Sequence, residues 1–303
     1  MTVPQKIIID TDPGQDDAVA ILLALASPEL EILAITAVAG NVSLALTQTN
    51  ARKICELAGR GEVAVHAGCD RPMARHLVTA ENVHGQSGLD GIALPEPVMP
   101  LRAGHAVDVI IEHLRAEPAG TVTLCVLGPL TNIATALQRA PDIAPRIKQI
   151  VLMGGAYFEV GNVTPAAEFN FYVDPEGAPL HDPCVIAYLL APELFGGRQV
   201  NVEIEVDSPL TRGMTVADWW GVTGRPANAL FIGSVDALAG GFAQRGVALD
   251  QRACHLVAER RRGDRKLAQR IEAQLALPTG ERVAGTHHEG AAHLHHVAHL
   301  QVG

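Results

Sequence analysis

Aromatic side chains are scarce in this sequence of 303 residues, at 4% of positions, whereas hydrophobic residues make up 48%. Aliphatic side chains must therefore fill the interior of the fold. No apolar run approaches the ~20 residues that cross a bilayer, so we expect no membrane partner. Basic residues are also scarce, since the sequence has 23 Lys and Arg but 33 Asp and Glu. The net charge of −10 argues against nucleic-acid binding.

Cysteines are few and lack metal-type spacing: Cys55, Cys69, Cys125, Cys184 and Cys254. An odd number of unpatterned cysteines indicates reduced thiols in a cytoplasmic protein. No signal peptide precedes the first predicted strand, which fits the same localisation. The G-x-x-x-x-G-K and G-x-G-x-x-G motifs are absent, so no common nucleotide-phosphate loop is predicted.

Acidic residues crowd into one stretch, Lys6–Ala26 (KIIIDTDPGQDDAVAILLALA). An apolar run at Ile7–Ile9 predicts a strand, and the apolar spacing after the turn predicts a helix. The turn between them carries Asp10, Asp12, Asp16 and Asp17. Crowded carboxylates repel one another unless a cation lies among them, and a helix N-terminus offsets only ~0.3–1 kcal/mol per charge. We therefore predict a hard divalent cation here, although some of these acids could instead cap the helix or lie solvated in the turn.

Strands and helices alternate along most of the chain. Apolar runs predict strands at 31–38, 62–66, 121–127, 147–152 and 199–206, and helical periodicity predicts helices at 44–58, 106–116, 133–139 and 185–190. Strand–helix–strand order implies right-handed crossovers and parallel pairing. We therefore predict an α/β fold with an open, mostly parallel Rossmann-like sheet and helices on both faces. Such sheets bind ligands at the carboxyl ends of their strands.

Several polar residues follow or flank the predicted strands, each with a plain alternative role. Asn41 ends a strand, where a turn residue is common. Thr131 and Asn132 open a predicted helix that they could simply cap. Asp182 precedes Pro183, a typical arrangement for an N-cap followed by proline.

Other candidates are weaker when taken singly. His84 lies in the Gly-rich stretch HGQSGLDG, which could be a turn or could lie across a pocket. Glu168, Asn170 and Asp174 alternate with apolar residues, a pattern that an edge strand would also show. His181, next to Asp182, is typical of an ordinary surface residue.

Taken together, these motifs resemble the nucleoside hydrolases, the inosine-uridine-preferring N-ribohydrolase family. DTDPGQDD at 10–17 and AITAVAGN at 34–41 carry the resemblance most specifically. Further blocks follow in the family's order: GPLTN at 128–132, MGG at 153–155, AEFNFYVDPE at 167–176 and HDP at 181–183. The resemblance covers roughly residues 4–235.

The resemblance implies hydrolysis of the N-glycosidic bond of ribonucleosides to ribose and free base, in nucleoside catabolism and in purine and pyrimidine salvage. It implies a small nucleoside as substrate and a homodimer or homotetramer. It also implies a Ca²⁺ ion held by Asp12, Asp17, Asp182 and the main-chain carbonyl of Thr131. Asp10 would then support the turn from behind.

Catalytic roles follow from the same resemblance. Asp16 would be the general base that deprotonates the attacking water, and His181 the acid that protonates a leaving purine base. His84 would contact the leaving group as well. The ribose would be bound by Asp16, Asn41, Met153, Glu168, Asn170 and Asp182.

The sequence departs from the family in two places. Only PEGAPL joins the VDPE block to HDP, where family members carry a long segment with a further strand and helices. Six residues span at most ~20 Å, so a sheet segment is missing. Residues 237–303 form an atypical Arg- and His-rich tail. We therefore expect a nucleoside hydrolase-like domain at 1–236, a disordered tail at 237–303, and turnover impaired by an open base-binding side.

Two other functions stay open at this point. One is a phosphatase of the haloacid-dehalogenase type, with Asp10 as nucleophile and Asp12 as acid, although Pro13 and Gly14 fit its pattern badly. The other is a catalytically inactive member of the nucleoside hydrolase family that binds ribose or calcium. The preference for purine or pyrimidine bases is not encoded in a motif that the sequence shows.

Overall fold

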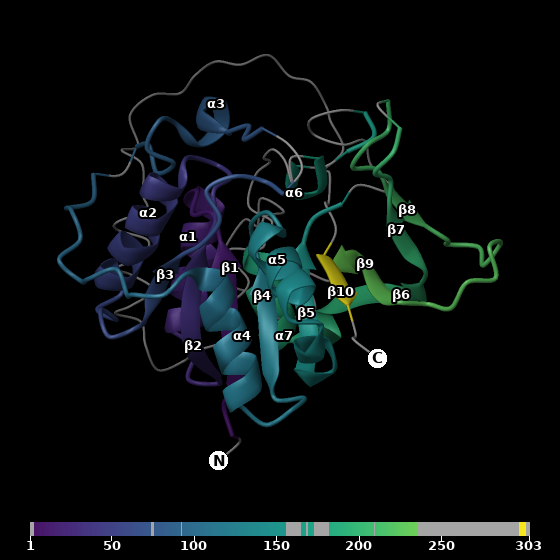
Figure 1. Ribbon diagram of the computed structural model, residues 1–303, viewed down its shortest axis with the longest axis horizontal. Coiled ribbons are helices and arrows are strands. Elements are labelled where there is room, and N and C mark those ends of the chain that lie inside the picture. Colours follow the sequence, from purple (N-terminus) through teal and green to yellow (C-terminus); the bar gives the residue numbers. More distant parts are fainter. Residues whose placement is uncertain are drawn as a thin grey trace, which may run out of the picture.

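The computed structural model describes residues 3–73, 76–91, 93–155, 165–167, 169–172, 182–208, 210–235 and 297–300. Its centre is an eight-stranded sheet in the order β3-β2-β1-β4-β5-β10-β9-β6 (Figure 1). The first five strands in this order are parallel: β1 (Gln5–Thr11), β2 (Leu30–Ala37), β3 (Val65–Ala67), β4 (Val122–Val126) and β5 (Ile147–Met153). The other three run antiparallel to their neighbours: β6 (Phe195–Val200), β9 (Ala229–Val235) and β10 (Val297–Leu300).

Helices cover both faces of the parallel part (Figure 1). Successive side chains of a strand point to opposite faces, so Ile7 and Ile9 of β1 pack on one side and Ile8 on the other. One layer contains α1 (Gln15–Leu25), α2 (Leu44–Leu57) and α7 (Pro183–Leu190). The other contains α4 (Ala106–Ala116), α5 (Thr131–Arg139) and the 3-10 helix η1 (Pro141–Arg146). Burial on both faces explains the continuous apolar runs in the sequence.

The order of connection reverses between β1 and β4. The chain goes from β1 to β2 and β3 on one side, and then crosses to β4 and β5 on the other. Asp10 on β1 lies in register with Thr36 on β2 and Val126 on β4. The loops after β1 and β4 therefore diverge at this point, where open α/β sheets bind ligands.

The predicted fold class is confirmed, whereas one local prediction and one alternative interpretation are wrong. The predicted strand at 199–206 is divided, since β6 ends at Val200 and β7 (Val202–Ile204) pairs with β8 (Thr215–Ala217) in a separate two-stranded sheet. Phe169–Tyr172 forms the short helix α6, not an edge strand. A run this short does not distinguish the two periods.

Part of the tail lies in the sheet. β10 pairs with β5 on one side and β9 on the other. The rest of 237–303 is outside the described residues, so the division at residue 236 stays a prediction. Within the described part of the chain, no helix is both long and apolar enough to cross a membrane.

Candidate active site

Asp10 supports the acidic turn from inside the fold. It is fully buried near the end of β1, and its Oδ1 accepts hydrogen bonds from Thr36 Oγ1 at 2.6 Å and Asn132 Nδ2 at 2.8 Å. Burial raises the pKa of Asp10 to about 7, against the opposing effect of these two donors. The side chain therefore links β1 to β2 and to the start of α5.

Asp12 is enclosed by main chain at the strand ends. Its Oδ2 accepts a hydrogen bond from the Asn41 main-chain nitrogen at 2.7 Å. A Cβ at Gly40 would lie 2.0 Å from Asp12 Oδ2, and one at Gly128 would lie 2.4 Å from Asp12 Oδ1. The two glycines therefore leave the space that this carboxylate occupies.

Asp17 lies on the first turn of α1, and three hydrogen-bond donors orient its carboxylate. Its Oδ1 accepts from Thr11 Oγ1 at 2.5 Å, and its Oδ2 accepts from Gly14 N at 2.9 Å and Asn41 Nδ2 at 3.3 Å. The bond to Gly14 N is the capping contact expected from an acid three residues into a helix. Asp17 thus caps α1 and also faces the site. The capping and site interpretations therefore both hold for this residue.

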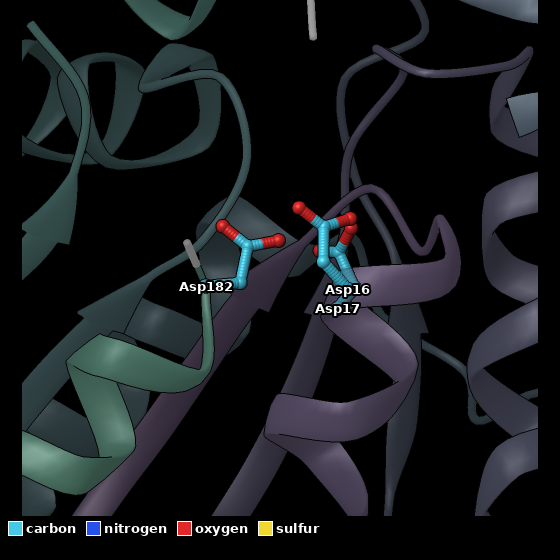
Figure 2. Close-up of side chains that lie close together, drawn as sticks. All are labelled: Asp16, Asp17 and Asp182. Carbon is cyan, nitrogen blue, oxygen red and sulfur yellow. The ribbon is translucent and has the colours of Figure 1, made fainter. Parts of the chain in front are cut away.

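Asp182 approaches from the start of α7 and faces Asp16 and Asp17 (Figure 2). Oxygen atoms of the three carboxylates lie within 4.8 Å of one another. Asp182 is the N-cap residue of α7, as its position before Pro183 suggested, but its side chain makes no capping bond. Residues far apart in sequence therefore bring three carboxylates to one point.

This cluster is electrostatically unfavourable without a cation. Burial and then the charge of Asp17 raise the pKa of Asp12 well above the usual carboxyl value. Burial and then the charges of Asp16 and Asp17 do the same to the pKa of Asp182. Among the described residues, no ion pair involves these acids, and Asp182 Oδ1 is buried without a hydrogen-bond partner. An all-oxygen donor set with excess negative charge suits a hard divalent cation.

Two asparagines fix the rim of this cluster. Asn41 Nδ2 donates to Asp12 O at 3.1 Å as well as to Asp17. Asn170 Nδ2 donates to Leu127 O at 2.8 Å and to Met153 O at 3.1 Å, and so connects the ends of β4 and β5. Asn41 therefore lies at the end of a strand, as predicted from its position, and Asn170 contacts the residues at the ends of β4 and β5 from α6.

His84 is the last residue of the short helix α3 (Glu81–His84). It is 4% exposed, and a Cβ at Gly14 would lie 2.7 Å from its Nδ1. Burial lowers the pKa of His84, while the charge of Asp17 opposes this effect. Its Nδ1 has no hydrogen-bond partner among the described residues. The ring is thus a buried imidazole beside the acidic turn.

Thr131 and Asn132 form the first two residues of α5, directly after β4. The N-cap is Leu130, which makes no side-chain capping bond, so neither residue caps the helix. Thr131 is buried, and the Asn132 side chain turns back to the strands. Glu168 and His181 lie outside the described residues, so their predicted roles stay predictions.

The family model for inosine-uridine preferring nucleoside hydrolases matches this chain over residues 7–179 and 176–239. The chain belongs to this family.

Relatives in the nucleoside hydrolase family agree with the match. An uncharacterised protein of Schizosaccharomyces pombe is 44% identical over 293 residues, covering 76% of this chain and 94% of the relative. The pyrimidine-specific ribonucleoside hydrolase RihA of Shewanella baltica is 41% identical over 297 residues, covering 77% of this chain and 93% of the relative. Among solved structures, a plant nucleoside hydrolase has a TM-score of 0.69 at 27% identity, covering 84% of this chain and 98% of that one. A purine-preferring ribonucleoside hydrolase from Gardnerella vaginalis has a TM-score of 0.66 at 27% identity, covering 74% of this chain and 91% of that one.

The alignments contain a gap that agrees with the segment predicted to be missing. The two matched parts of the nucleoside hydrolase model meet at 176–179, inside PEGAPL. The alignment with the S. pombe relative runs over 293 positions, whereas 76% of 303 residues is about 230. The difference leaves about 60 alignment positions without a residue of this chain.

The environment of Asp10 bears on the phosphatase alternative. A phosphatase nucleophile must meet its substrate, whereas Asp10 is fully buried and bonded to Thr36 and Asn132. The environment of Asp10 therefore disfavours that role.

Sequence reasoning missed Thr36 and the close packing of Gly40 and Gly128 on Asp12. Thr36 lies inside a predicted strand, where a threonine is typical of β structure and gives no separate signal. Gly40 and Gly128 do follow predicted strands, so their positions were the available signal.

Proposed function

We propose that this nucleoside hydrolase cleaves the N-glycosidic bond of ribonucleosides with a bound divalent cation, calcium, and releases ribose and the free base. Asp12, Asp17, Asp182 and the main-chain carbonyl of Thr131 would hold the cation. The observation that carries this proposal is the convergence of the Asp16, Asp17 and Asp182 carboxylates within 4.8 Å, together with the unpartnered Asp182 Oδ1. The charge of Asp12 adds to this cluster, since the pKa of Asp182 is raised by burial, by the charges of Asp16 and Asp17, and also by that of Asp12. When bound, the cation would supply the positive charge that lowers the pKa of a coordinated water.

Asp16 is the general base in this proposal. It lies in the carboxylate cluster with Asp17 and Asp182, and at 5% it is slightly more exposed than Asp10, Asp12, Asp17 and Asp182, which are between 0% and 2% exposed. Its carboxylate would take a proton from the attacking water as the water oxygen bonds to C1′. The C1′–N bond breaks, its electron pair leaves with the base, and the base is protonated there. His181 would donate that proton to a purine.

The ribose would lie over the strand ends. Asn41, Glu168, Asn170 and Asp182 would bind its hydroxyls, with Met153 lining the sugar pocket and His84 near the leaving group. Positive charge develops on the sugar as the C1′–N bond breaks. The surrounding carboxylates would stabilise that charge, because they are already oriented by hydrogen bonds and need no reorganisation.

Turnover is expected to be low, because the missing segment would leave the base side of the site open. Water that enters weakens the electrostatic interactions within a site. The curated relatives named as pyrimidine-specific hydrolases are 40–41% identical, so uridine and cytidine are the first substrates to try. The purine-preferring Gardnerella enzyme is 27% identical and makes inosine the natural comparison.

The test is a reducing-sugar assay with uridine, cytidine and inosine on metal-stripped protein, before and after calcium is added. We expect ribose release only with calcium, and its loss in Asp16→Ala but not in Asp207→Ala, an exposed control. Activity that survives Asp16→Ala and disappears in Asp12→Asn with calcium binding intact would transfer the base role to Asp12. Absence of ribose release despite calcium binding would instead support the inactive, ligand-binding alternative.

A further inference from the structure

Asn132 connects the carboxyl ends of four strands through one side chain. It is fully buried on the first turn of α5, which follows β4. Its Nδ2 donates to Asp10 Oδ1 on β1 at 2.8 Å and to Ala37 O on β2 at 3.2 Å. Its Oδ1 accepts from the main-chain nitrogen of Cys69, just after β3, at 2.9 Å.

The surrounding backbone is shaped to admit this amide. A Cβ at Gly68 would lie 2.3 Å from Asn132 Oδ1 and 2.5 Å from its Nδ2, so only glycine fits there. Gly68 N itself donates to Ala37 O at 2.9 Å, the same carbonyl that Asn132 binds. The amide is therefore part of the main-chain network at the sheet edge.

The chemistry of this position requires an asparagine. The side-chain amide offers two donor hydrogens and an acceptor oxygen, and it makes two hydrogen bonds as donor and one as acceptor. An aspartate would lose the donors and place a second carboxylate against buried Asp10. An alanine would leave buried Asp10 Oδ1 with one donor fewer and the Cys69 main-chain nitrogen without this acceptor.

We infer that Asn132 is a positioning residue for the cation site, and this inference rests on the proposed function. Asn132 adjoins Thr131, whose carbonyl is a proposed ligand, and bonds to Asp10, which lies two residues before the proposed ligand Asp12. It thus holds the β1 turn and the start of α5 in fixed relation. Partners that orient metal ligands from behind are worth roughly 10- to 100-fold in metal affinity.

The test compares Asn132→Asp and Asn132→Ala with Ile133→Ala. Ile133 is the next residue of α5, 2% exposed, and packs into the apolar cluster that α4 and α5 form with the sheet. Calcium dissociation constants of the metal-stripped proteins are measured by calorimetry, with melting temperatures, kcat and KM for uridine alongside. We expect both Asn132 variants to bind calcium roughly 10- to 100-fold more weakly and to lose kcat more than KM rises. Ile133→Ala lowers the melting temperature but keeps the wild-type calcium affinity.

Three outcomes overturn the inference, and the third is distinguishable from the first two. Wild-type calcium affinity in both Asn132 variants, or an equal loss of affinity in Ile133→Ala, shows that Asn132 serves stability alone. A wild-type protein that binds no calcium refutes the proposed function and this inference with it.

Discussion

The substitution Gly40→Ala, which adds one methyl group, tests the geometry of the site. A Cβ there would lie 2.0 Å from Asp12 Oδ2 and 2.9 Å from Pro129 Cγ, whereas ordinary contact begins at 3.4 Å. In Gly40→Ala the carboxylate must therefore retreat by about 1.4 Å, the difference between 3.4 and 2.0 Å. Such a shift breaks its 2.7 Å hydrogen bond from Asn41 N and moves a proposed ligand. A misplacement of about 1 Å costs roughly 100-fold in rate, or about 2.7 kcal/mol of barrier.

The assay measures calcium affinity by calorimetry and ribose release at saturating calcium. Gly61→Ala is the matched control, because a Cβ at Gly61 meets no atom within 4 Å. We expect Gly40→Ala to lose roughly 100-fold in kcat/KM and to bind calcium more weakly, with Gly61→Ala unchanged in both. A folded Gly40→Ala protein with wild-type affinity and rate would refute the role of Asp12 in the site.

Three further predictions follow from the acids and the sheet. Calcium at 100 times its dissociation constant stabilises by about 2.7 kcal/mol, which raises the melting temperature by roughly 5–10 °C; an unchanged melting curve contradicts the site. The pKa of Asp182 is raised in the fold, so its contribution to stability is greatest below the ordinary carboxyl pKa of 3.8 and is lost as pH rises. In chelator, Asp182→Asn should therefore raise the melting temperature more at pH 8 than at pH 4; an equal effect at both pH values refutes this linkage. Deletion of 297–303 should lower the melting temperature, because β5 and β9 lose the strand between them, and an unchanged value would contradict that pairing.

The alternation of strands and helices was predictable because both signals are local. The apolar run at Ile7–Ile9 and the helical spacing after Asp17 describe β1 and α1 without tertiary information. The same reasoning failed at Phe169–Tyr172, where four residues are too few to show a period. It also failed after Val200, where the chain leaves one sheet for another.

The site was predictable as a set of residue types but not as an arrangement. Four acids in one turn indicated a cation, whereas Asp182 taken singly was typical of a helix cap and only the family resemblance implied it as a ligand. The fold places it against Asp16 and Asp17. The role of Asn132 depends on contacts with β1, β2 and the residue after β3. Contacts between distant segments leave no periodic trace in a single sequence.

The central claim is that Asp12, Asp17 and Asp182 hold one divalent cation at which a nucleoside is hydrolysed. The most direct measurement is a calcium titration of metal-stripped protein that follows bound ion and ribose release together. We predict one ion per chain, with the rate rising along the same binding curve, and loss of both in Asp182→Asn. Full-rate ribose release in chelator, or one tightly bound calcium retained in Asp182→Asn, would contradict the account.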